Sequence, residues 1–112
     1  MGDGSMMYSI QALWTAAKYR VPLTLLVLNN AEYGAMKLFK NLFKIPSFPP
    51  AIETSLDLPG IDLCAIAQGL GVTAVRVDSA AELPEVLQTA LTSDGPMLVD
   101  VAVRPVRGVG PL

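Results

Sequence analysis

Three short, largely apolar runs are the plainest feature of the hydrophobic pattern, and they cover residues 21–28, 72–77 and 97–103. Runs of this kind are typical of strands that are buried on both faces of a parallel sheet. Apolar residues at helical spacing lie between and before them, and predict helices over residues 5–19, 33–44, 62–68 and 79–93. The alternation predicts an α/β fold: a doubly wound, mostly parallel sheet with helices on both faces, whose first strand is missing before Gly2.

Two further segments show neither pattern. Residues 45–60 contain four prolines and no hydrophobic period, which predicts a long Pro-rich loop. Residues 104–112 are predicted to form a loose tail. Repeats and low-complexity segments do not occur in the sequence, and its 112 residues suit a single domain over residues 1–112.

Composition narrows the class of protein. Hydrophobic residues make up 52% of the sequence and charged residues only 16%, which excludes intrinsic disorder and suggests that apolar surface is covered by something else. The net charge of −2 and the lack of a basic run argue against nucleic acid and anionic membranes as partners. Since no apolar stretch approaches 18 residues, we expect neither a transmembrane helix nor a signal peptide.

The types of residue also limit the chemistry. The single cysteine, Cys64, excludes an internal disulfide, fits a reducing cytoplasm and is expected to be a buried small hydrophobe. The sequence has no histidine, which excludes a Ser-His-Asp triad and histidine general-base catalysis.

Asp3 and Asn30 suggest a binding site, because they are separated by about one helix and one strand. If a strand precedes Gly2, both residues follow neighbouring parallel strands, at the edge where open α/β sheets bind ligands. Two oxygen ligands near helix N-termini suit an anion held through a hard cation, and Mg²⁺ with a diphosphate fits best. Lys18 and Arg20 lie at the far end of a predicted helix about 22 Å long, so they cannot neutralise the phosphate.

These residues also carry a family resemblance. Gly2-Asp3-Gly4-Ser5, followed after 23 residues by Asn29-Asn30, resembles the GDG…NN signature of thiamine-diphosphate-dependent enzymes. The continuation from Asn29 to Lys37 (NNAEYGAMK) and the later Leu58–Asp62 (LPGID) look most like benzoylformate decarboxylases. The resemblance runs from Gly2 to about Val103 and corresponds to the C-terminal diphosphate-binding domain of that family.

The resemblance implies a role for particular residues. Asp3 and Asn30 would give side-chain oxygens to Mg²⁺, and Glu32 its backbone carbonyl. Apart from the resemblance, the Glu32 carboxylate is expected simply to face solvent. Contacts to the diphosphate of thiamine diphosphate are implied for Gly4, Ser5, Asn30, Tyr33, Gly34 and Ala35. Met36 and Phe39 would line the substrate pocket, although apolar residues at this spacing also suit an ordinary core, as does Tyr33. Pyruvate-type decarboxylases carry a glutamate at the position of Met36, so an apolar residue there favours an aromatic 2-oxo acid.

Departures from the family pattern limit the expected activity. The family's catalytic glutamate belongs to an N-terminal domain, and the active-site histidines of the benzoylformate branch are absent, so no catalytic residue is expected in this chain. We therefore expect a fragment that is inactive alone, and whose partners are a small 2-oxo acid, the N-terminal and middle domains of the parent enzyme, and further copies in a homo-oligomer. An acetolactate-synthase-like carboligase domain and a non-catalytic remnant that serves as an interaction domain stay open as alternatives.

Overall fold

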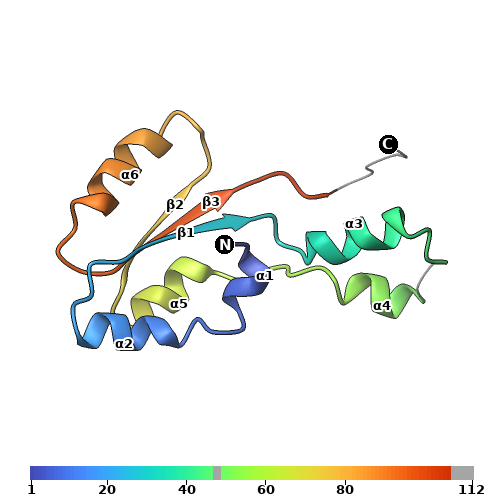
Figure 1. Cartoon of the computed structure of the whole chain (residues 1–112), viewed down its shortest axis with the longest axis horizontal. Helices are drawn as coiled ribbons and strands as arrows, with labels where there is room; N and C mark the ends of the chain where they lie inside the picture. Colours follow the sequence, from blue (N-terminus) through green and yellow to red (C-terminus); the bar gives the residue numbers. More distant parts are fainter. Residues whose placement is uncertain (47–48, 107–112) are drawn as a thin grey trace.

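A parallel sheet forms the centre of the computed structural model, which describes residues 1–46 and 49–106. Within these residues the sheet has three strands, β1 (Thr24–Asn29), β2 (Thr73–Val77) and β3 (Met97–Ala102), in the order β1-β3-β2 (Figure 1). The central strand, β3, is buried from Met97 to Asp100 and pairs in parallel with both neighbours. The predicted strands are thus confirmed, with ends that differ by up to three residues.

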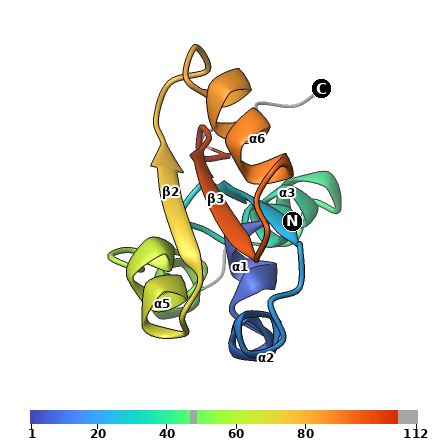
Figure 2. The same cartoon turned by 90° about the vertical axis from the view of Figure 1, so that its left-hand side faces the viewer.

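Helices cover both faces of this sheet, as predicted (Figure 2). One face packs against α1 (Asp3–Met6), α2 (Ala12–Lys18) and α5 (Leu63–Gly69), with Val27 and Leu98 of the strands in that core. The other face packs against α6 (Leu83–Leu91), and its core includes Val77, Ala90, Met97 and Val99. Leu98 and Val99 point to opposite faces because side chains alternate along a strand, so an unbroken apolar run serves two cores at once.

The predicted helix over residues 5–19 is divided into α1 and α2. Between them the backbone turns through i to i+3 hydrogen bonds, such as Tyr8 N–H to Ser5 O (3.3 Å) and Ser9 N–H to Met6 O (3.1 Å). Tyr and Ser are weak helix formers, and Tyr8 is exposed, so packing does not compensate for that low propensity. The apolar spacing therefore marks the buried face correctly but not the continuity of the helix.

The predicted loop over residues 45–60 contains a short helix instead, α4 (Pro50–Thr54). Proline is favoured at the first position of a helix, because its φ is already helical and its missing N–H has no partner to lose there. The Thr54 hydroxyl donates back to the carbonyls of Pro50 and Ala51 (both 3.1 Å). A helix of five residues is too short to give a hydrophobic period.

The predicted tail is anchored at its start, since the Val106 N–H donates to the Glu32 carboxylate; residues 107–112 lie outside the described residues. At the other end of the chain, Gly2 forms a parallel bridge with Leu28, and Leu28 N–H donates to Met1 O (2.8 Å). Met1 and Gly2 thus occupy the place beside β1 that the sequence argument assigns to the end of a strand. None of the described helices has the length and apolar character needed to cross a membrane.

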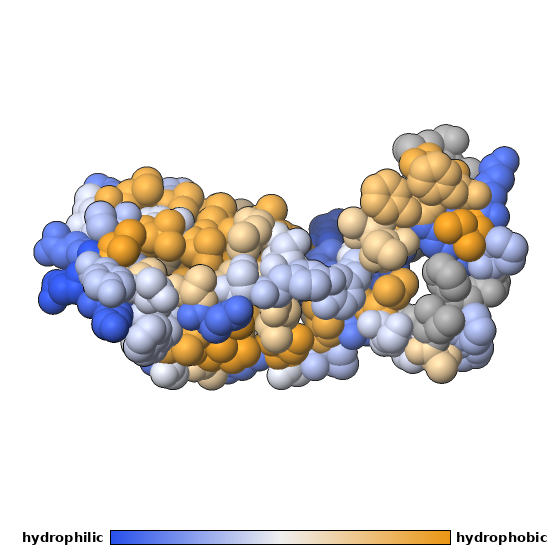
Figure 3. All heavy atoms as spheres, turned by 60° about the horizontal axis from the view of Figure 1, so that its bottom comes forward, coloured by the Kyte–Doolittle hydropathy of each residue, from blue (hydrophilic) through white to orange (hydrophobic). Residues whose placement is uncertain are grey.

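Helices α3 (Gly34–Leu42) and α4 form an arm that extends away from the sheet (Figure 1). The radius of gyration is 16.0 Å, against about 13 Å for a compact chain of this length. Apolar side chains gather on the arm's surface (Figure 3), and those exposed are Met36, Leu38, Phe39, Leu42, Phe43 and Ile45. This surface contributes to the low fraction of charged residues, together with exposed apolar side chains elsewhere, such as Trp14 and Leu91.

Candidate metal and cofactor site

A tight turn follows β1 and sets the geometry of the site. Ala31 has a left-handed backbone (φ 55°), and its N–H donates to the Asn29 side-chain oxygen (3.0 Å). The Ala31 carbonyl accepts from Leu58 N–H (2.8 Å), and Tyr33 N–H donates to Leu56 O (2.7 Å). The turn is therefore tied on one side to the end of the strand and on the other to the segment that leads away from α4.

Three oxygens from this turn and from α1 converge. Asn30 Oδ1 lies 3.1 Å from Asp3 Oδ1 and 2.9 Å from the backbone oxygen of Glu32. Since all three are acceptors, they repel one another unless a cation lies between them or the amide turns over. A turned amide would donate to Asp3 and to the Glu32 carbonyl, but its oxygen would then face the Glu32 carboxylate, to which Nδ2 now donates (3.4 Å). With its oxygen toward Asp3 the Asn30 amide suits a cation, and with its nitrogen there it forms two hydrogen bonds.

The spacing of these polar atoms is compatible with Mg²⁺ as well as with hydrogen bonds from a turned amide. Ligands at 2.0–2.1 Å from Mg²⁺ that meet at right angles are about 2.9 Å apart, whereas the longer bonds of Ca²⁺ would give about 3.3 Å or more. Asp3 and Glu32 are buried, 6% and 5% exposed. No cluster of three His, Cys, Asp or Glu side chains occurs in the described part of the chain, so an amide and a carbonyl must complete any such ligand set.

A cavity of about 230 Å³ opens beside the three oxygens. All of the residues proposed from the sequence line it except Phe39; they are Asp3, Gly4, Ser5, Asn30, Glu32, Tyr33, Gly34, Ala35 and Met36. Phe39 lies further along α3 and stacks on Phe43, with ring centroids 6.0 Å apart. Met36 and Phe39 are about half exposed, so the alternative that they belong to a buried core is wrong.

Two glycines allow close packing at this cavity. A Cβ on Gly4 would lie 2.7 Å from the ring of Tyr33, and one on Gly34 would lie 2.7 Å from Asn30 Nδ2. Neither glycine has a positive φ, so what each position requires is space. The Tyr33 ring can therefore close over α1, and the Asn30 amide can lie against the start of α3.

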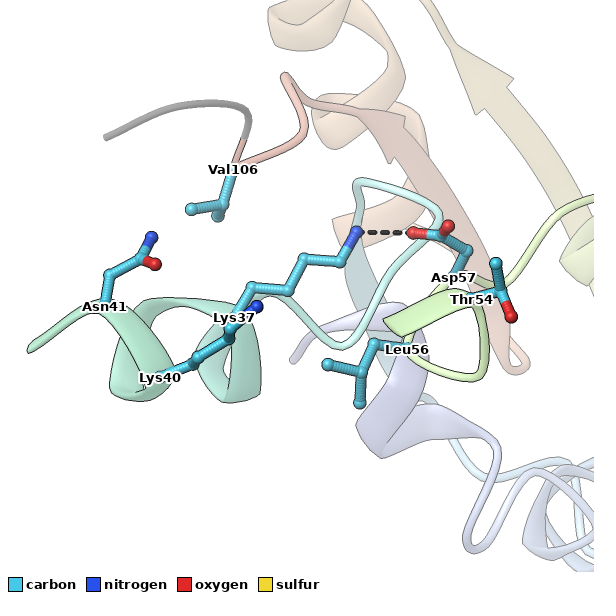
Figure 4. A pocket seen from close by; sticks show the side chains of 7 residues that line it. All are labelled: Lys37, Lys40, Asn41, Thr54, Leu56, Asp57 and Val106. Carbon is cyan, nitrogen blue, oxygen red and sulfur yellow. Dashed lines mark hydrogen bonds and ion pairs between the residues drawn. The ribbon is translucent and has the colours of Figure 1, made fainter. Parts of the chain in front are cut away.

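The Glu32 carboxylate is buried in an ion-pair cluster, so the expectation that it faces solvent is wrong. Lys37 Nζ pairs with both Glu32 and Asp57, and the Val106 N–H donates to the other Glu32 oxygen. Figure 4 shows Lys37 reaching from α3 toward Asp57, across a second cavity of about 380 Å³. Hydrogen bonds to Asp57 and Glu32 raise the pKa of Lys37 above its ordinary value. The cluster holds the Glu32 side chain, and an isolated antiparallel bridge joins Glu32 to Asp57.

Sequence reasoning missed Lys37 and Asp57, which lie 20 positions apart and meet only because α3 and the segment after α4 run side by side. It also missed Asp100, although a charged residue inside an apolar strand is a visible signal. Cys64 is partly buried, less than the sequence predicts, and this burial raises the pKa of its thiol, with nearby carboxylates adding to the effect.

Known proteins are similar to this chain in sequence. Benzoylformate decarboxylase of Pseudomonas aeruginosa is 42% identical over 106 residues, which cover 95% of this chain and 19% of that protein. Acetolactate synthase of Bacillus subtilis is 31% identical over 102 residues, covering 91% of this chain and 17% of that protein. The chain thus spans about a fifth of the length of the curated relatives that it matches.

Solved structures agree with this relationship. A thiamine diphosphate-dependent 4-hydroxybenzoylformate decarboxylase from Rhodococcus jostii superposes with a TM-score of 0.86 at 36% identity, over 96% of this chain and 20% of that one. Benzoylformate decarboxylase from Polynucleobacter necessarius superposes with a TM-score of 0.85 at 32% identity, over 100% of this chain and 20% of that one. The family described as "Thiamine pyrophosphate enzyme, C-terminal TPP binding domain" matches residues 1–101. The chain therefore belongs to the family of C-terminal thiamine diphosphate-binding domains of thiamine diphosphate-dependent enzymes.

Proposed function

We propose that this domain holds the diphosphate of thiamine diphosphate through Mg²⁺, as part of an enzyme that decarboxylates an aromatic 2-oxo acid. The observation that carries the proposal is the convergence of the Asp3 carboxylate, the Asn30 amide and the Glu32 carbonyl, whose polar atoms lie 2.9 and 3.1 Å apart. Asp3 and Asn30 would bind the ion through their side chains, and Glu32 through its carbonyl. Oxygens of the diphosphate and water would complete the six ligands that Mg²⁺ prefers.

The charge of the cavity supports a cation between protein and diphosphate. None of the described residues that line it is lysine or arginine, whereas Asp3 and Glu32 are acidic. A diphosphate could not approach two buried carboxylates without a counter-charge. The first N–H groups of α3, at Gly34 and Ala35, face no intrahelical acceptor and suit the phosphate oxygens, as do the backbones of Gly4 and Ser5 and the side of Tyr33.

Met36 and Phe39 would shape the substrate pocket. When bound, thiamine diphosphate supplies the nucleophilic carbon and the electron sink that decarboxylation of a 2-oxo acid requires. Met36 presents an apolar, half-exposed side chain at the same cavity as the three oxygens, which supports an aromatic substrate, and Phe39 would extend that apolar wall. We assign no catalytic residue to this chain. The exposed apolar arm supports association with the N-terminal and middle domains of the parent enzyme or with further copies of it in a homo-oligomer. We place this enzyme in the cytoplasm.

An acetolactate-synthase-like carboligase is the second candidate, because acetolactate synthases are also among the relatives. It would share the diphosphate site and differ in its product, because such an enzyme joins the decarboxylated fragment to a second 2-oxo acid. Product analysis of the assembled enzyme separates the two: an aldehyde indicates the decarboxylase, and a ligated hydroxy-oxo acid indicates the carboligase. The intact set of three oxygens argues against a domain that has lost its cofactor.

Calorimetric titration of the 112-residue chain with thiamine diphosphate, with and without Mg²⁺, tests the proposal. Binding should require Mg²⁺, and Asp3→Asn should weaken it at least tenfold, because the carboxylate is replaced by a neutral side chain of the same shape. Asp94→Asn is the matched control, since Asp94 is an exposed residue in the turn before β3. Binding that is independent of Mg²⁺, or equal loss in both variants, would overturn the proposal.

A further inference from the structure

Asp100 is a buried carboxylate that lies outside the candidate cavity. It is 2% exposed, within the central strand β3, and does not line the cavity with the three oxygens. Its Oδ2 accepts from Asn29 Nδ2 of β1 (3.2 Å) and from an Arg76 guanidinium nitrogen of β2 (3.0 Å). The three side chains thus form a polar row across all three strands on the face that packs against α1 and α5.

This row is not explained by stability alone. The other carboxylate oxygen, Asp100 Oδ1, is buried and has no hydrogen-bond partner among the described residues. A buried acceptor without a partner destabilises a fold, and an apolar residue would suit the centre of an otherwise apolar strand. The carboxylate therefore calls for a reason beyond packing.

The row reaches the candidate site through Asn29. The Asn29 amide donates to Asp100 with its nitrogen and accepts from Ala31 N–H with its oxygen. Because an ionised carboxylate only accepts hydrogen bonds, Asp100 determines which end of this amide faces it, and so points the oxygen at Ala31. Ala31 has the unfavourable left-handed backbone, which this hydrogen bond helps to maintain.

We propose that Asp100, held by Arg76, is a positioning residue for the metal-binding turn, an inference that rests on the function proposed above. Ala31 lies between Asn30 and Glu32, which supply two of the three converging oxygens. A change in the Ala31 backbone would move both of them, and Mg²⁺ tolerates only small departures from its octahedral geometry. Asp100 acts through Asn29, without contact to the ion or the diphosphate.

An exchange of the two side chains tests this role. Asn29→Asp alone places two carboxylates against each other, and Asp100→Asn alone removes the group that fixes the amide. In the double variant N29D/D100N, the new amide can donate to the new carboxylate, which still accepts from Ala31 N–H. We expect each single variant to bind Mg²⁺ and thiamine diphosphate at least tenfold more weakly, and the double variant to return to within about threefold of the original chain.

Two measurements keep the result decisive. Calorimetry gives the affinity, and amide hydrogen exchange of Ala31 in the ligand-free chain should rise in the single variants and fall again in the double variant. Asp78→Asn is the control, because it removes an Arg76 partner that does not contact Asn29, and it should change neither measurement. If D100N does not fold, the comparison of N29D with N29D/D100N still decides the test, because the second substitution should restore the affinity that N29D loses.

The experiments distinguish a failure of the role inferred for Asp100 from a failure of the proposed function. An original chain that binds no cofactor overturns the proposed function, while Ala31 exchange still tests the row of polar residues. A chain that binds normally but whose single variants bind as well as the original overturns the role of Asp100. A double variant no better than N29D overturns it as well, because the coupling between the two side chains would be absent.

Discussion

Gly34→Ala changes the candidate site through one methyl group. Gly34 begins α3 and is buried, and because its φ is not positive, alanine fits its backbone without strain. The added Cβ would lie 2.7 Å from Asn30 Nδ2, 3.0 Å from Val106 Cγ2 and 3.5 Å from Glu32 Oε1. Its effect is therefore steric and falls mainly on the amide that supplies one of the three oxygens.

The size of the effect follows from these distances. An ordinary contact between such atoms is about 3.5 Å, so the Asn30 amide must retreat by about 0.8 Å. Metal ligands must keep their bond lengths within about 0.2 Å, so Asn30 would no longer bind the ion in its present geometry. We expect Mg²⁺-dependent binding of thiamine diphosphate to weaken 10- to 100-fold, which corresponds to about 1.4–2.8 kcal/mol.

Titration calorimetry of Gly34→Ala and of Gly69→Ala measures their affinity for thiamine diphosphate in the presence of Mg²⁺. Gly69 ends α5, and a Cβ there would meet nothing within 4 Å, so this control should bind as the original chain does. Equal affinity of Gly34→Ala and the original chain, in a folded protein, would refute the assignment of Asn30 as a ligand. A loss in Gly69→Ala of the same size would show instead that the affinity responds to any added methyl group.

Four further predictions concern the fold, the ion pairs, the thiol and activity. Gly71→Ala should lower the free energy of unfolding in urea by about 1–2 kcal/mol, because Gly71 has φ 84°; an unchanged midpoint would contradict this. Hydrogen bonds to Asp57 and Glu32 raise the pKa of Lys37 in the folded chain. The ion pairs therefore stabilise the fold fully below pH 10.5, and this stabilisation is lost as the pH rises through the higher folded pKa. Urea unfolding from pH 7 to 11 should show that loss in the original chain and not in Lys37→Met. Burial raises the pKa of Cys64, so iodoacetamide should alkylate it at pH 8 more slowly in the folded chain than in urea, and equal rates would contradict the burial. The isolated chain with Mg²⁺ and thiamine diphosphate should release no aldehyde from benzoylformate or pyruvate above the cofactor-only rate.

The sequence predicts the sheet well because burial on both faces requires apolar residues at every position of a strand, as in Met97–Val99. It also predicts that Asp3 and Asn30 approach each other, since the carboxyl ends of neighbouring parallel strands meet at one edge. Both results depend on periodicity and chain direction, which a single sequence contains.

Contacts between distant side chains are the part that sequence patterns do not contain. The burial of Glu32 depends on Lys37, Asp57 and Val106, which come from three separate segments. Helix α4 has five residues, fewer than two helical turns, so it leaves no hydrophobic period to detect. Asp100 stands out as a charge in an apolar strand, but its connection to Ala31 through Asn29 appears only when β1 and β3 are adjacent.

The position of β3 between β1 and β2 has a consequence for how the protein folds. The outer strands pair with β3 and not with each other, and Thr24 and Met97 become neighbours although most of the chain separates them. Closing so long a loop loses entropy before any contact compensates for it, and such non-local pairing slows folding. During synthesis, residues 1–96 can form helices but no strand ladder of this sheet. The hydrogen bond from Asn29 to Asp100, which orients the Asn29 amide toward Ala31, can therefore form only once β3 has been inserted.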